Sequence, residues 1–493
     1  MFLESSWSFD LTEYSSVWDI TIQLCLVMGA LLLGNTLRRI IPFLRKAFIP
    51  SALIGGLILL GVNLLSELVA GDFFTETLGR NSIISERLMQ ILTYHSLAIG
   101  FIAMSLKTVN KGKHRIGMKA IKNGMITGGT YMIQAVCGII VSLVFFYLGF
   151  EKFYDAGIIL PLGFGQGPGN ALTWDINFTN NLSREGLDLG FNGQGSFGLT
   201  IASIGFIVAS IVGVVYINFY KRKGDIAYKE AVEIKQEVSN YVHENEIEDS
   251  ESVDKTTIQI AFVILSYFLA FLIMFFLAKL SDWTGVALFN SIAWGFNFIF
   301  GVITATLVKG LIQLLTKKNI IKKRYISNYQ MDRISGFAFD MMIVAGVAAI
   351  DINIVAEYIW LIIALSVVGT VVTFVYVKLM VNACFKEIKH EAFLVNYGTL
   401  TGTASNGMIL LREVDPNYET QTSNIFILSQ FPAMLTVAPL LLLLTLSAKS
   451  LTSCFIALGI FFLLFIVYTV VLILASKGKI LKDKEVPEDN ENE

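Results

Sequence analysis

The chain has 493 residues, of which 54% are hydrophobic and only 15% are charged, and its mean hydropathy is +0.65. A typical soluble protein is about 45–50% apolar and about 25% charged, so this composition excludes a soluble enzyme, a disulfide-rich secreted protein and a disordered chain. The net charge of −2 favours no nucleic-acid partner. Apolar runs of about 20 residues, the length that crosses a bilayer, predict an all-α polytopic membrane protein.

The first half of the chain contains five predicted spans. An acidic segment, 1–18, precedes them and carries no lysine or arginine, so we expect it to lie outside the cell. The five spans cover residues 19–35, 49–70, 88–106, 123–149 and 196–219.

A second set of spans follows a charged segment, 221–256, which we interpret as a cytoplasmic linker. An additional span near 451–475 lies within 447–476, and a polar tail, 477–493, ends the sequence. The five spans of the second half cover 257–279, 285–315, 334–350, 354–383 and 424–446.

The positive charges predict how these eleven spans are oriented. Most of the 37 lysine and arginine residues lie in alternate connections, beginning with the one after the first span. Cytoplasmic loops carry an excess of these residues. We therefore expect a multi-pass protein of the cell (plasma) membrane, with its N-terminus outside and its C-terminus in the cytoplasm.

The two halves, 19–220 and 257–446, have the same number of spans. Because five is an odd number, two similar halves would cross the membrane upside down relative to each other. This arrangement is the inverted repeat found in many secondary transporters. The predicted fold is therefore two inverted five-span repeats plus one extra C-terminal span.

Each half also contains a glycine-rich segment between its fourth and fifth spans. The first is 163–171, inside a predicted hairpin at 156–183, and the second is 397–407, inside one at 392–414. Non-helical backbone at membrane depth is tolerated only where protein or a water-filled cavity satisfies it. We predict two re-entrant hairpins that enter from opposite faces, although tight helix packing is an alternative role for either segment alone.

Such breaks have a definite binding chemistry. Freed carbonyl groups bind cations, so we expect hairpin carbonyls to hold sodium, and amides at the start of a returning helix favour an anion. Asn170, and Ser405 or Asn406, stand where a helix N-cap is expected. The candidate substrate- and ion-binding residues of the two hairpins are Gly165, Gln166, Gly167, Gly169, Asn170, Thr399, Thr401, Gly402, Thr403, Ser405 and Asn406.

Two ionisable residues complete the candidate site. Asp340 lies within a predicted span, where an ionisable side chain is a functional candidate by default. Arg412 follows the second hairpin and could neutralise a substrate carboxylate, the alternative being an ion pair with Glu413 or Asp415.

Other classes of membrane protein are disfavoured by their motifs. The sequence contains neither a GxxxxGK[ST] nucleotide motif nor an HExxH metalloprotease motif, so we expect no enzyme and no ATP-driven pump. A channel is the remaining alternative, because re-entrant loops also build selectivity filters. Filter loops usually recur around a pore, however, whereas these two are predicted to enter from opposite faces.

The motifs resemble those of the glutamate:sodium symporter (ESS, GltS-type) family. The similar features are the run FIPSALIGG at 48–56, both glycine-rich segments, and the run GTLTGTASN at 398–406, and the resemblance covers about residues 19–446. It implies sodium-coupled uptake of glutamate, a homodimer, no cofactor besides Na⁺, and elevator-type movement of a transport domain. A Na⁺- or H⁺-coupled carrier of another small carboxylate is the alternative.

Overall fold

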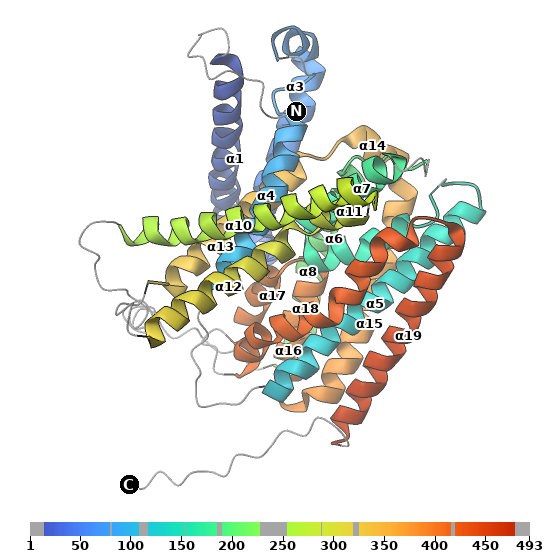
Figure 1. The fold of residues 1–493 in the computed structure, drawn as a ribbon. Helices are drawn as coiled ribbons and strands as arrows, with labels where there is room; N and C mark the ends of the chain where they lie inside the picture. The colour runs from blue at the N-terminus through green and yellow to red at the C-terminus, as the bar shows by residue number, and fades with distance from the viewer. Residues whose placement is uncertain are drawn as a thin grey trace.

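The computed structural model describes residues 14–78, 81–107, 117–151, 153–184, 190–226, 254–286, 288–318, 325–415 and 420–478. All regular structure within these ranges is helical, and no strand occurs in them (Figure 1). The predicted all-α class is therefore confirmed for the part of the chain that is described. Most of the acidic N-terminal segment, the charged linker and the polar tail lie outside the described residues.

The α-helices follow the predicted spans in chain order, and a short 3₁₀ helix precedes each of α6 and α16 (Ala156–Ile159 and Lys386–Ile388). The α-helices are α1 (Tyr14–Ile40), α2 (Pro42–Lys46), α3 (Ser51–Leu78), α4 (Glu86–Leu106), α5 (Gly117–Tyr147), α6 (Leu160–Gln166), α7 (Pro168–Arg184), α8 (Ser196–Lys223), α10 (Lys255–Thr284), α11 (Leu288–Gly295), α12 (Asn297–Lys317), α13 (Asn328–Ala348), α14 (Ile352–Glu357), α15 (Ile359–Cys384), α16 (Lys389–Thr401), α17 (Ala404–Arg412), α18 (Thr422–Ser447) and α19 (Leu451–Ser476).

Nine helices of the described chain are long and apolar enough to cross a membrane: α1, α3, α4, α5, α8, α10, α12, α15 and α19. Helix α18 adds a tenth if its two parts, Thr422–Gln430 and Pro432–Ser447, form one span with a 42° bend. Proline explains the bend, because it lacks the amide hydrogen of a regular helix and its ring crowds the preceding turn. The chain is thus a polytopic membrane protein.

The prediction of eleven full spans is too high by this measure, and α13 accounts for the difference. Its helix forms close to the predicted 334–350. Every stretch of 18 residues within it, however, includes Asp332, Arg333 and Asp340. Three ionisable residues exceed the usual charge content of a membrane span, so α13 can cross a membrane only where other helices or a water-filled cavity accommodate them.

The predicted span 285–315 is also not a single helix. It divides into α11 and α12 at Phe296, whose φ of −122° and ψ of 36° interrupt the helical backbone. The side chain of Asn297, the first residue of α12, donates to the carbonyl of Tyr94 in α4 at 3.1 Å. The break therefore lies where α12 is attached to α4.

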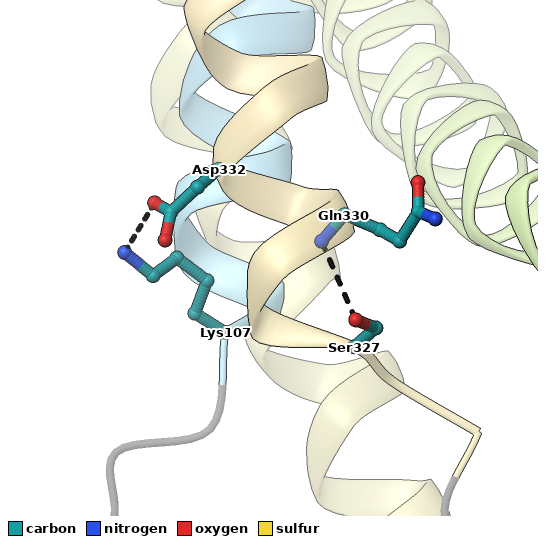
Figure 2. A network of polar contacts seen from close by, with 4 residues as sticks. All are labelled: Lys107, Ser327, Gln330 and Asp332. Carbon is teal, nitrogen blue, oxygen red and sulfur yellow. Dashed lines mark hydrogen bonds and ion pairs between the residues drawn. The ribbon is translucent and has the colours of Figure 1, made fainter. Parts of the chain in front are cut away.

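The two ends of α4 contact different parts of the chain. Near its start, Gln90 donates to the carbonyl of Gln194, just before α8, at 2.9 Å. At its other end, Lys107 forms a 2.6 Å ion pair with Asp332 in the first turn of α13, and Ser327 caps α13 by accepting from the amide of Gln330 (Figure 2). Both ends of α4 are therefore attached to segments at the starts of other helices.

Two central helices organise the packing. Helix α4 packs along α13, α12 and α7, whereas α5 packs along α18, α15 and α19 (Figure 1). The short helices α6 and α16 contact each other and both contact α5. The two glycine-rich segments are consequently held inside the helix bundle, where their side chains meet residues from other spans.

Candidate functional site

The first glycine-rich segment contains one sharp break, at Gly167, between α6 and α7. Its φ of 78° and ψ of −172° lie in a region that is open essentially to glycine alone. Pro168 then starts α7, the position at which proline's missing amide hydrogen costs nothing. The non-helical part is therefore much shorter than the predicted 163–171.

The second glycine-rich segment breaks at Gly402 and Thr403, between α16 and α17. Helix α16 continues through the predicted loop as far as Thr401. Within that helix, Thr399 and Thr401 each donate a 2.7 Å hydrogen bond to the carbonyl four residues earlier. Their oxygens are thus held against their own helix rather than in an open loop.

The predicted N-caps are wrong. Helix α7 begins at Pro168 and α17 begins at Ala404, so Asn170, Ser405 and Asn406 lie inside the first turns. Thr403 occupies the N-cap position of α17, but its side chain makes no capping hydrogen bond. The reason is that both helices start two or three residues earlier than their polar residues suggest.

The two breaks meet. A Cβ placed on Gly167 would lie 3.3 Å from Cγ2 of Thr403 and 3.6 Å from Cε of Met342, which belongs to α13. Helices α7 and α17 therefore both begin at one place, although their first residues are more than 200 positions apart. Because the start of a helix carries partial positive charge, this place favours an anion.

Four polar side chains at these breaks have buried atoms without a hydrogen-bond partner among the described residues. Both amide atoms of Asn170 and of Asn406 are unpaired, as are Oε1 of Gln166 and Oγ1 of Thr403. Asn170 is 1% exposed and Asn406 is 4% exposed. Buried polar atoms are nearly always paired, so this group, which we call the tip cluster, is unusual for a protein interior.

Neighbouring helices surround the tip cluster with residues that the sequence did not single out. Tyr131 of α5 lies beside the end of α6, and its ring carbon Cζ is 2.5 Å from where a Cβ on Gly165 would be. Met342 of α13 adds an apolar wall beside Gly167. No local pattern marks these two residues, because they reach the site only through helix packing.

The other candidate residues have varied positions. Gly169 packs against Leu97 of α4, and Gly402 packs against the Asn406 amide. Ser405 and Asp340 are exposed. Arg412 is exposed as well, at the end of α17. Eight residues at about 1.5 Å each separate it from the helix start, so the structure does not bring Arg412 to the breaks.

A metal centre of the usual kind is not found in the described ranges, which contain no group of three or more histidine, cysteine, aspartate or glutamate residues able to hold a metal ion. The oxygens available at the breaks are those of amides, hydroxyls and backbone carbonyls. Such uncharged oxygens suit a monovalent cation better than a divalent one, which usually takes carboxylates.

Comparisons with known proteins return no match for this chain, whether with protein-family models, with curated proteins or with solved structures. The site is therefore interpreted from its own geometry. That geometry combines two helix starts, six buried polar atoms without partners on four side chains, and a surrounding wall of tyrosine, leucine and methionine.

Proposed function

We propose that this protein is a secondary active transporter whose substrate binds at the tip cluster. The observation that carries the proposal is the meeting of two helix breaks in the protein interior, lined by buried polar atoms without partners. An unpaired buried polar group costs about 1–3 kcal/mol. Two buried asparagine amides without partners, with the unpaired oxygens of Gln166 and Thr403 beside them, are consistent with a ligand that satisfies them for part of a transport cycle.

The inverted repeat in this proposal is supported by helix contacts that occur in both halves. Helix α1 packs against α3, and α10 packs against α12; α3 contacts α13, and α12 contacts α4. Helices α4 and α13, α5 and α15, and α6 and α16 contact each other directly. A two-fold axis that exchanges the first half of the chain for the second would produce these pairings. In this arrangement the two broken segments are re-entrant hairpins beside the axis.

The proposed substrate is a small carboxylate, and glutamate is the first to test. Two helix starts favour a negatively charged group, and the asparagine amides can donate to its oxygens. The resemblance of the 398–406 run to glutamate:sodium symporters favours Na⁺ as the coupling ion. The lysine-rich connections favour an N-terminus outside and a C-terminus in the cytoplasm.

Uptake into proteoliposomes tests this function. Purified protein should accumulate radiolabelled glutamate when an inward Na⁺ gradient is imposed without ATP, and uptake should saturate. Asn170→Ala should lower uptake strongly, whereas Asn424→Ala, at an exposed position on α18, should leave it unchanged at equal protein content.

The same vesicles separate the alternatives. Uptake that persists when the Na⁺ gradient is collapsed and a proton gradient remains would indicate H⁺ coupling. Transport of other carboxylates in place of glutamate would change the substrate but keep the mechanism. Unitary currents without saturable accumulation would indicate a channel and contradict the proposal.

A further inference from the structure

A second polar feature is Gln134 of α5, which contacts the end of α16 two residues before its break at Gly402. This side chain is completely buried. Its amide nitrogen donates to Oγ1 of Thr373 in α15 at 2.7 Å and to the carbonyl oxygen of Leu400 in α16 at 3.1 Å. Its amide oxygen has no hydrogen-bond partner among the described residues.

The two other buried glutamines of the described chain show how unusual this is. The amide nitrogen of Gln23 donates to the carbonyl of Ile83 and its oxygen accepts from the amide of Ser85. Gln259 likewise donates to the carbonyl of Tyr325 and accepts from the amide of Ser327. Both glutamines are therefore paired at each end, whereas Gln134 is paired only through its nitrogen.

The partners of Gln134 are themselves oxygens that suit a cation. The carbonyl of Leu400 belongs to the last turn of α16, where carbonyl groups have no partner within the helix and carry partial negative charge. Thr373 contributes a hydroxyl that is also fully buried. The NH₂ group of Gln134 donates to both, and so occupies the place where a positive charge would be favoured.

We propose that Gln134, Thr373 and Leu400 form a binding site for a monovalent cation, with Na⁺ as the ion that fits. Turning the Gln134 amide by half a rotation would exchange its nitrogen for its oxygen. The Gln134 oxygen would then lie about 2.7 Å from the Thr373 hydroxyl and about 3.1 Å from the Leu400 carbonyl, the distances that its nitrogen now has. Oxygen ligands lie about 2.3–2.6 Å from Ca²⁺, and Na⁺ has nearly the same size. Neighbouring oxygens around such an ion lie a little farther from one another than from the ion.

The chemistry of these ligands determines the class of ion. None of the three carries a charge, and a divalent cation usually requires carboxylate ligands. A buried ion held by uncharged oxygens must therefore bring little charge with it.

This site deepens the proposed function, on which it rests, because it would link the coupling ion to substrate binding. Leu400 lies two residues before the break at Gly402, and the next residue, Thr403, belongs to the tip cluster. An ion that draws the Leu400 carbonyl toward α5 and α15 would fix the end of α16 and thereby position the start of α17. Binding of the cation would in this way order the place where the anion binds.

Thermal unfolding of the purified full-length protein tests the site without transport. The apparent Tm is measured over a range of NaCl, with choline chloride keeping the ionic strength constant. A ligand that binds the folded state raises the Tm with its concentration. We expect Na⁺ to raise the Tm of the wild type. Gln134→Leu and Thr373→Val should each need at least about ten times more Na⁺ to reach half of the Tm shift. A tenfold weaker affinity corresponds to a loss of about 1.4 kcal/mol of binding free energy, which we attribute to one lost ligand.

Gln259→Leu is the matched control, since it removes a buried glutamine that is paired at both ends. It should lower the Tm at every salt concentration and leave the response to Na⁺ unchanged, and Thr373→Ser should retain the wild-type response. If Gln134→Leu and Thr373→Val both respond to Na⁺ as the wild type does, the site is wrong while Na⁺ coupling stands. If the wild type responds to no alkali cation, the site is equally wrong, and the uptake experiment decides the proposed function separately.

Discussion

Replacing Asn406 by leucine separates a functional role of the tip cluster from a structural one. Asn406 is 4% exposed, and neither atom of its amide has a partner among the described residues. Leucine has the same branching at Cγ, with two somewhat larger methyl groups in place of the amide atoms, and leaves no polar atom behind. The substitution therefore breaks no hydrogen bond of the described structure and removes an unsatisfied buried amide, which costs about 1–3 kcal/mol.

We expect the stability of the protein and its transport activity to change in opposite directions. The free energy of unfolding should rise, by up to about 1–3 kcal/mol, and the apparent Tm of the purified protein should rise with it. Glutamate uptake should fall, because the substrate loses a donor at the start of α17. A loss of the same size in binding is roughly a 5- to 150-fold weaker apparent affinity.

Asn396→Leu provides the matched control in α16. Asn396 is 1% exposed, but its amide nitrogen donates to Oδ1 of Asn123 at 2.7 Å and to the carbonyl of Ala392 at 2.8 Å. Removing this amide leaves buried acceptors unpaired, so the Tm should fall. If Asn406→Leu lowers the Tm as Asn396→Leu does, and uptake falls only in proportion to the amount of folded protein, the tip cluster is a packing element and the reasoning is refuted.

Two further predictions concern the connections outside the candidate spans. Burial raises the pKa of Asp155, between α5 and α6, from 3.8 to about 7, so the folded state holds this proton more tightly than the unfolded chain. The free energy of unfolding should then fall as the pH rises through this window; Asp155→Asn should reduce the slope of Tm against pH, and an unchanged slope would contradict the assignment. For the orientation, single cysteines introduced at 107–119 or 317–324, in a variant without the four native cysteines, should resist membrane-impermeant thiol reagents in intact cells, and labelling there would reverse the predicted topology.

Local sequence was sufficient for the helices and for the approximate positions of the breaks. Apolar runs of about 20 residues have to bury their backbone polar groups within a helix, whatever their neighbours are. Glycine and proline interrupt that pattern at 163–171 and 397–407 because of their own backbone properties. For these features the physical cause lies within one stretch of chain, so the printed sequence already contains it.

The exact helix limits depended on more than local sequence. Helix α16 extends to Thr401 and so includes the first five residues, 397–401, of the segment predicted to be non-helical. Asn170 and Asn406 resemble N-caps but are the third residues of their helices, where the surrounding packing leaves them unpaired. Preferences of this kind are worth about 1 kcal/mol, which contacts with other helices easily exceed.

Only the tertiary structure decided which residues share a site. Gly167 lies against Thr403, and Gln134 bonds to Leu400, across separations of more than 200 residues. Nothing near Gln134 in the sequence distinguishes it from Gln23 or Gln259, since all three are glutamines within apolar helices. What distinguishes it is whether a partner from a distant helix reaches its amide oxygen, and that is settled by how the helices pack.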